Sequence, residues 1–211
     1  MVYIQKKKDI LWGGATASSQ YEGGYDLDGK GLDTQDCRPY LKRTSDATTA
    51  TRLLTQEVID EAKKCQGIGN YPFRKGSDGY HHIDEDIALL KELGIDIYRF
   101  SISWARLYPQ GDELEPNKEG IAFYDHIFKE VHKAGMKIFL TMNHYAVPLY
   151  LVENYGGWTN RKLVTFYERF AKTVFEHWGQ YIDYFLPFNE INAGYFSPYN
   201  GVGLDKEKDQ P

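Results

Sequence analysis

The strongest constraint on the fold is a pattern that occurs three times along the chain: an amphipathic helix, a glycine, an apolar stretch and a polar end. The three glycines are Gly94, Gly135 and Gly179, which lie 41 and 44 positions apart. Such a period is typical of successive βα units, because each helix crosses back along the sheet before the next strand begins. The pattern therefore predicts parallel strands.

The expected helices each place apolar residues on a single face. The first spans about 82–93, and Ser77 or Asp78 can cap its start. The three apolar faces consist of Ile83, Ile87 and Leu90; Ile121, Tyr124, Phe128 and Val131; and Leu163, Phe166, Phe170 and Val174. The expected strands are 10–17, 95–104, 136–145 and a fourth that starts at Tyr184.

Strands that are apolar along their length and polar where they end are typical of a (β/α)8 TIM barrel, with functional groups at the C-terminal strand ends. A doubly wound sheet is the less favoured alternative, because no Gly-rich phosphate loop follows any strand. Four strands supply half of a barrel. We therefore expect residues 1–211 to be the N-terminal half of one (β/α)8 catalytic domain. Its open sheet edges need the absent C-terminal half, or an oligomer partner, to cover them.

Residues 26–79 lack clear periodicity and predict a long irregular loop, interrupted by one possible short helix near Gln56–Lys64. Cys37 and Cys65 lie in this region and match no metal-binding spacing. We expect free thiols and assign them no chemistry.

Charge and composition exclude several classes of function. The net charge is -5, from 25 basic and 30 acidic residues, which provides no electrostatic footprint for nucleic acid. No apolar stretch approaches the roughly 20 residues that span a bilayer, and the N-terminus lacks the apolar core of a signal peptide. A cytoplasmic protein without membrane contact is the resulting expectation.

The fourth strand ends in the most informative pair of residues. The stretch YFLPFNEIN, 184–192, changes abruptly from apolar residues to Asn189 and Glu190. A carboxylate beside an amide is costly to bury unless each group has a task. We interpret Glu190 as a proton donor; the alternative is that it caps a following turn.

Arg99 lies inside an apolar strand, between Tyr98 and Phe100. An unpaired buried cation costs several kcal/mol, so Arg99 needs a carboxylate nearby. Its partner could be Glu190 or a carboxylate on a strand outside this chain. A structural ion pair with an ordinary core acid is the alternative.

His144 ends its strand as Glu190 ends the next. The imidazole could ligate a metal, act as a base or bind a substrate hydroxyl. A metal needs at least two further ligands, and His81 and His82 open a helix on the far side of a strand, so hydroxyl binding is favoured. No metal or other cofactor is expected.

Amide and imidazole groups at separate strand ends suit a sugar, which needs polar partners for its hydroxyls and flat apolar faces for its ring. The candidates for the hydroxyls are Gln20, His144 and Asn189. The nearby aromatic residues are Trp104, Tyr145, Tyr195 and Phe196, while Trp158 and Trp178 are interpreted as packing residues.

Four segments together resemble the retaining β-glycosidases of glycoside hydrolase family one, in that family's order. They are LWGGATASSQYEGG at 11–24, YRFSISWARLYPQG at 98–111, NHYAVP at 143–148 and FNEIN at 188–192. The resemblance implies that Glu190 is the general acid/base and that Asn189 binds the hydroxyl beside the anomeric carbon. It also implies that Gln20 and His144 hold hydroxyls further round the ring, and that Arg99 supports the nucleophile.

The sequence departs from the family pattern in two places. Ala146 stands where an Asp is usual, and the T-E-N-G motif that carries the second carboxylate does not occur in these residues. Retaining chemistry requires two carboxylates about 5–5.5 Å apart. We therefore expect the isolated 211 residues to show no glycosidase turnover.

Two features resemble the members that act on 6-phospho-β-glucosides: Ile191 directly after Glu190, and the stretch YPQGDELEPN. A plain β-glucosidase is the alternative within the family. The alternative from another class is a non-catalytic remnant that binds sugars or assembles with another protein through its open sheet edge.

Overall fold

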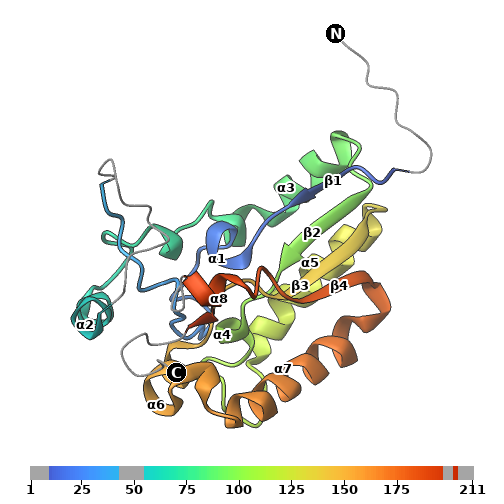
Figure 1. Ribbon diagram of the computed structural model, residues 1–211. Helices are drawn as coiled ribbons and strands as arrows, with labels where there is room; N and C mark the ends of the chain where they lie inside the picture. The colour runs from blue at the N-terminus through green and yellow to red at the C-terminus, as the bar shows by residue number, and fades with distance from the viewer. Residues whose placement is uncertain (1–9, 43–54, 197–201, 204–211) are drawn as a thin grey trace.

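The computed structural model describes residues 10–42, 55–196 and 202–203. Its centre is a parallel sheet of four strands in the order β1-β2-β3-β4 (Figure 1). The strands are β1 Gly13–Ala15, β2 Ile97–Ser101, β3 Lys137–Asn143 and β4 Ile182–Phe188. The prediction of parallel strands joined by helices is confirmed. The first three strands are shorter than their apolar stretches, whereas β4 begins at Ile182, two residues before the predicted start at Tyr184.

Three long helices connect these strands and pack against the sheet. They are α3 Gly79–Glu92, α5 Lys118–Lys133 and α7 Lys162–Trp178. The shorter helices are α1 Ser18–Tyr21, α2 Gln56–Lys64, α4 Trp104–Leu107, α6 Leu149–Tyr155 and α8 Ala193–Phe196, with 3-10 turns at η2 Pro72–Arg74, η3 Gly157–Thr159 and η4 Gly179–Tyr181. The sequence predicted α2, but it gave no signal for α1, α4, α6 or α8, which are too short to show a period.

The helix ends agree only partly with expectation. Gly94 and Gly135 adopt left-handed φ values of 71° and 83°, as glycines that end helices often do. Gly179, however, keeps a right-handed φ of -51° and continues into η4. The start of α3 follows Asp78, but the Asp78 carboxylate binds the His81 ring instead of capping a backbone N–H.

Aromatic rings fill the core between the helices and the sheet. Trp178 stacks on Phe128 with ring centres 5.0 Å apart, and Trp104 stacks on Phe170 at 5.4 Å. Trp158 packs against Trp104 with the ring planes tilted by 46°, so Trp158 and Trp178 are packing residues as predicted. Trp104 is also a core residue, only 1% exposed, because it begins α4 and points into the packing layer; its expected place beside a sugar is wrong.

The long loop is more ordered than its sequence suggests. The buried Arg74 guanidinium donates hydrogen bonds to four backbone carbonyls, those of Asp36, Ala62, Cys65 and Gly67. These bonds join the segment after β1 to the end of α2. Residues 43–54 lie outside the described residues. Both cysteines are free thiols, as expected, and burial raises the pKa of Cys37 to about 12.

Two buried ionic groups stabilise the residues that follow β1, one within the loop and one to α4. Lys30 bonds Asp36 at 2.6 Å, and Asp33 lies 3.3 Å from the same ammonium group. Burial opposes the charge on Lys30, but these two carboxylates together raise its pKa. A few residues earlier, Glu22 pairs with Arg106 at 3.2 Å. The loop is therefore anchored by paired charges as well as by apolar contacts.

Among the described residues, β1 and β4 each pair along one edge only. The apolar run of β4 predicts a buried strand, yet Tyr184 and Phe185 are 47% and 53% exposed, because no described strand lies on their outer side. On the other edge, a groove of about 460 Å³ lies between α3 and the residues just after β1, and it is lined in part by Thr16, Leu89 and Leu93. The exposed part of β4 is apolar, while the groove combines leucines with polar residues such as Glu85 and Asp86; no described strand covers either surface.

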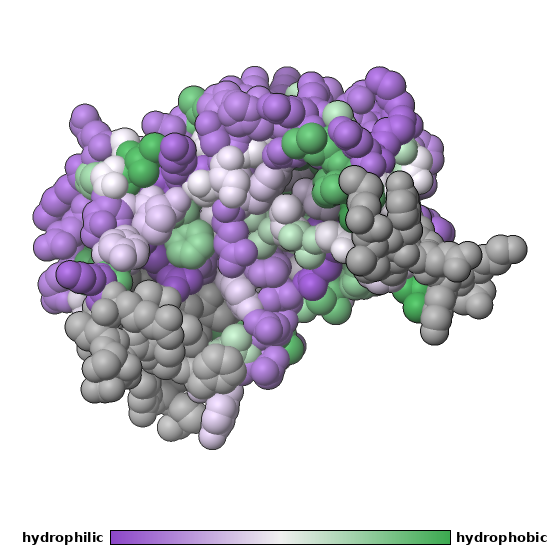
Figure 2. All heavy atoms as spheres, turned by 90° about the horizontal axis from the view of Figure 1, so that it is seen from above, coloured by the Kyte–Doolittle hydropathy of each residue, from purple (hydrophilic) through white to green (hydrophobic). Residues whose placement is uncertain are grey.

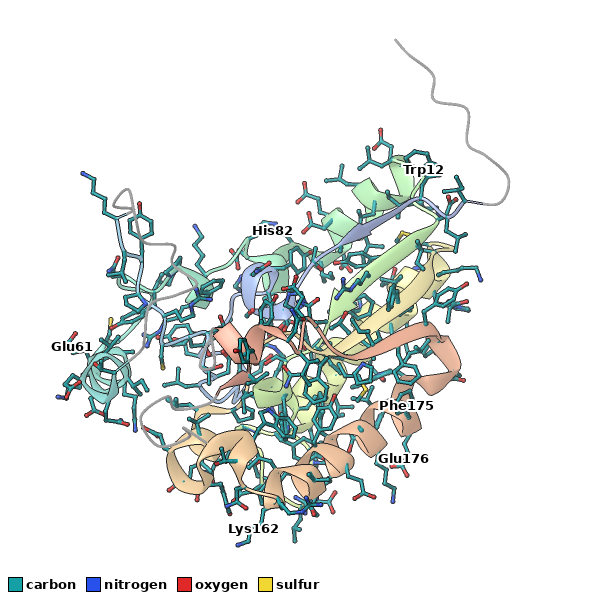
Figure 3. All side chains as sticks on the ribbon, viewed as in Figure 1. Trp12, Glu61, His82, Lys162, Phe175 and Glu176 are labelled. Atoms are coloured by element: carbon teal, nitrogen blue, oxygen red, sulfur yellow. The ribbon has the colours of Figure 1, made fainter. Side chains whose placement is uncertain are left out.

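Two aromatic side chains near the edges of the sheet can be located in the figures. Trp12 stands at the end of β1 remote from α1, and Phe175 projects from α7, where its ring contacts Phe185 of β4 (Figure 3). In the face shown in Figure 2, hydrophilic residues form most of the margin and apolar or weakly polar residues lie nearer the middle. Within the described parts of the chain, no helix is both long enough and apolar enough to cross a bilayer.

Candidate active site

The C-terminal ends of the strands bring the predicted residues to one edge of the sheet (Figure 1). Arg99 lies in β2, His144 follows β3, and Asn189 and Glu190 follow β4. Gln20 lies in α1, directly after β1. Parallel pairing explains this convergence, since all four strands end on the same side.

Arg99 orients Asn189. Its Nη2 donates to Asn189 Oδ1 at 2.6 Å, and its Nε donates to Thr141 Oγ1 at 2.8 Å. The backbone N–H of Asn189 also donates to the carbonyl of Asn143 at 2.9 Å. Of the two partners considered for Arg99, Glu190 is not the one it contacts here: the cation, only partly buried, binds an amide and a hydroxyl. A carboxylate on a strand outside this chain stays a prediction.

Glu190 lies on the exposed side of this cluster, one residue beyond the buried Asn189. Its Oε2 accepts a hydrogen bond from the Tyr145 hydroxyl. The Glu190 carbonyl accepts the N–H of Ala193 at 2.7 Å, so the backbone of Glu190 also begins the turn that leads into α8. The proton-donor and turn interpretations are thus compatible, because one uses the side chain and the other the backbone.

His144 is a neutral imidazole in this site. Burial, followed by the nearby positive charge of Arg99, lowers the pKa of His144 to about 4. Its Nδ1 is buried without a hydrogen-bond partner among the described residues. Because Nδ1 is buried, the nitrogen of this uncharged ring that could bind a hydroxyl group is Nε2, as either donor or acceptor.

Gln20 is exposed on α1, and no side-chain hydrogen bond joins it to the other four residues within the described ranges. The contacts of Thr141 with Arg99 and of the Tyr145 hydroxyl with Glu190 were not predicted. A signal existed for Thr141, which is a polar residue inside an apolar strand. No local pattern shows which way the Tyr145 hydroxyl points.

The described residues contain no group of three or more His, Cys, Asp or Glu side chains that could hold a metal ion. Ala146, where the family pattern has Asp, is buried directly after Tyr145. The chemical groups of the site are therefore one exposed carboxylate, one oriented amide, one neutral imidazole and one guanidinium.

A parallel βα array with these groups at its C-terminal strand ends defines part of a TIM-barrel enzyme. The chain belongs to glycosyl hydrolase family 1, since the sequence model of that family matches residues 3–207. It is 44% identical over 195 residues to the phospho-cellobiase of Klebsiella oxytoca, covering 92% of this chain and 39% of that protein. It is 42% identical over 197 residues to the 6-phospho-beta-glucosidase AscB of Escherichia coli (strain K12), covering 93% and 40%.

Solved structures show the same fold. Aphid myrosinase superposes with a TM-score of 0.71 at 31% identity, covering 91% of this chain and 37% of that one. A rice Os3BGlu6 beta-glucosidase gives 0.71 at 28% identity, covering 89% and 34%. The chain thus spans between about a third and two fifths of the length of these relatives, and its four strands form part of their barrel.

Proposed function

We propose that this chain is the N-terminal half of a retaining β-glycosidase that hydrolyses 6-phospho-β-glucosides, with residues 1–211 as one part of a single (β/α)8 domain. The observation that carries the proposal is the arrangement at the end of β4: an exposed Glu190 carboxylate follows Asn189, whose amide is held by Arg99. The phosphorylated substrate class is supported by the names of the two relatives, a phospho-cellobiase and a 6-phospho-beta-glucosidase, and by the sequence after Glu190.

In this proposal Glu190 acts twice. It first protonates the glycosidic oxygen as the leaving group departs, and it then takes a proton from the water that attacks the glycosyl-enzyme intermediate. The intermediate requires a second carboxylate as nucleophile. We infer that this group comes from a segment outside the present 211 residues, on the remaining strands of the barrel.

The neighbouring residues would bind the sugar. Because Asn189 Oδ1 already accepts from Arg99, its Nδ2 is the atom that can donate to the hydroxyl beside the anomeric carbon. Neutral His144 and exposed Gln20 would take hydroxyls further round the ring. Arg99 uses two of its five donors on Thr141 and Asn189, so the others can support the nucleophile carboxylate.

The open edges need a partner in the same scheme. The groove between α3 and β1 and the exposed outer face of β4 would be covered by the C-terminal half of the barrel, or by an oligomer partner. Burying these apolar side chains would contribute about 25 cal/mol per Å² of area removed from water. The expectation of a cytoplasmic protein stays a prediction.

A completed barrel tests the function. The chain is joined to the C-terminal remainder of the Escherichia coli relative, and hydrolysis of nitrophenyl β-glucoside is compared with that of its 6-phosphate. We expect the 6-phosphate to be hydrolysed with the higher kcat/KM, while the unjoined chain turns over neither. A clear preference for the unphosphorylated glucoside would indicate the plain β-glucosidase.

Because the donated remainder can itself influence the preference for phosphate, a Glu190→Gln version of the same fusion is measured in parallel. Loss of hydrolysis in that version assigns the activity to this chain's carboxylate. Sugar binding without turnover in the unchanged fusion would favour the non-catalytic remnant. Rapid turnover by the unjoined 211 residues would contradict the proposal that the nucleophile lies elsewhere.

A further inference from the structure

Tyr145 and Glu190 meet across two neighbouring strand ends. The Tyr145 hydroxyl donates to Glu190 Oε2, although the two residues are 45 positions apart in the sequence. Each lies two residues beyond the last residue of its strand, β3 for Tyr145 and β4 for Glu190. The paired register of these strands, with Asn143 opposite Phe188, brings the two turns together.

The backbone supports this contact in an unusual way. Tyr145 has a φ of 71° and Glu190 a φ of 43°, and neither residue is a glycine. Left-handed values cost free energy for residues with a Cβ and persist only where the surroundings enforce them. Both turns therefore adopt a costly conformation at the two residues whose side chains meet.

The ring and the hydroxyl of Tyr145 have separate contacts. The ring packs edge on against His144, with centres 4.7 Å apart, which an aromatic residue without a hydroxyl could also do. Only the hydroxyl reaches Glu190. Any aromatic residue here could therefore pack against His144, but only a tyrosine can bind Glu190.

A general acid/base has two oxygens, but only one can face the glycosidic oxygen at a time. We propose that Tyr145 is a positioning residue for Glu190: its hydroxyl holds Oε2 and leaves Oε1 as the oxygen that gives and takes the proton. Tyr145 keeps its own proton in both steps and donates a hydrogen bond throughout. This inference rests on the proposed function for its catalytic meaning, but the contact itself can be tested without turnover.

The first test uses the 211-residue chain with 13Cζ-labelled tyrosine. We expect the Tyr145 resonance to move during an acid-to-neutral titration and to lose that movement in Glu190→Gln. Tyr155 is a matched internal control, because its hydroxyl donates to the Asp112 carboxylate at 2.8 Å, away from the site. Its resonance should titrate equally in both proteins, which also shows that the variant is folded. A Tyr145 resonance that is indifferent to Glu190 overturns the proposal.

The second test uses the completed barrel with Tyr145→Phe, and with Tyr155→Phe as the control that removes an equivalent hydroxyl-carboxylate bond elsewhere. Tyr145→Phe should lower kcat on the order of tenfold with little change in KM, since small misplacements of a reacting group are costly. Tyr155→Phe should leave both unchanged. A kcat for Tyr145→Phe equal to that of the control contradicts the positioning role.

The outcomes separate the two proposals. A barrel that hydrolyses neither glucoside, while the Tyr145 resonance still follows Glu190, contradicts the proposed function and leaves the contact established. An active barrel in which Tyr145→Phe leaves kcat unchanged contradicts the positioning role alone.

Discussion

Arg99 in the second strand fixes the amide of Asn189 after the fourth, through a 2.6 Å hydrogen bond from Nη2 to Oδ1. The bond spans 90 positions of sequence and determines which end of the Asn189 amide faces outward. A cation that the sequence could only describe as needing a carboxylate therefore orients a neutral donor next to the proposed acid.

Replacing Arg99 tests this orientation directly. In Arg99→Met the amide loses a charge-assisted bond, so the side-chain NH2 resonances of Asn189 should shift and broaden. The free energy of unfolding should fall by about 1–2 kcal/mol, at the low end for bonds to charged groups because Arg99 is partly exposed. Arg161→Met, at an exposed position before α7, is the control and should change neither the Asn189 resonances nor the free energy of unfolding. Unchanged Asn189 resonances would contradict the orienting role.

Glu190→Gln should abolish proton transfer while keeping the shape of the side chain. In the completed barrel we expect kcat to fall by about 10²- to 10⁴-fold, the usual contribution of a general acid/base, with KM changed much less. Glu176→Gln is the matched control, because Glu176 is an exposed glutamate on α7 (Figure 3). Steady-state kinetics on a nitrophenyl substrate measure kcat and KM for both variants. Equal rates for the two variants would remove Glu190 from the mechanism.

His144 should titrate far into the acid range. Burial and Arg99 lower its pKa from the ordinary 6.5 to about 4, so the unfolded chain binds a proton there that the folded chain does not. Its contribution to stability is therefore complete above pH 6.5 and is lost as the pH falls toward 4. The Cε1–H resonance gives the midpoint, and His144→Gln should flatten the pH dependence of unfolding in this window. A midpoint near 6.5 would show that the ring is solvated.

The intact ion pair between Glu22 and Arg106 should contribute little to the free energy of unfolding, but removing only one of its two charges should lower that free energy strongly. Both side chains are buried, and Tyr124 donates to the second carboxylate oxygen at 2.6 Å. Glu22→Gln leaves an unpaired buried cation and should cost about 3–5 kcal/mol in urea unfolding. Adding Arg106→Met should recover part of that loss. A double variant less stable than the single one would show that the charges contribute beyond their mutual neutralisation.

Arg74 should control the stability of the long loop. Arg74→Met removes donors from four carbonyls and should destabilise the protein by about 3 kcal/mol or more, since each bond from a charged donor contributes about 1.5–3 kcal/mol. Lys64→Met, at an exposed position in α2, controls for loss of charge. Equal unfolding midpoints for the two variants would mean that the loop is held by other contacts.

The periodic parts of the chain were predictable because their signal is local. Ile83 and Ile87 in α3, like Tyr124 and Phe128 in α5, are four positions apart on one helical face, and all four are buried. The parallel order of the strands follows from the helix that crosses between each pair. The polar strand ends at His144 and Glu190 were predicted for the same reason, since a change from apolar to polar residues is visible without a structure.

The contacts between these strand ends were not predictable. The sequence indicated that Arg99 needs a partner, but only the register between β2 and β3, and between β3 and β4, decides that Thr141 and Asn189 are within reach. The burial of Trp104 depends on α4, a helix of one turn that has no periodic signal. Such features arise from packing between distant segments.

By itself, the sequence determined the repeated βα unit, the parallel sheet and the set of polar groups at its C-terminal edge. The tertiary structure alone decided that Arg99 orients Asn189, that Tyr145 contacts Glu190 and that Arg74 organises the long loop. The physical reason is the range of the forces involved. Backbone periodicity is set within one or two turns of chain, whereas the direction of a hydrogen bond between side chains depends on how separate strands and loops pack together.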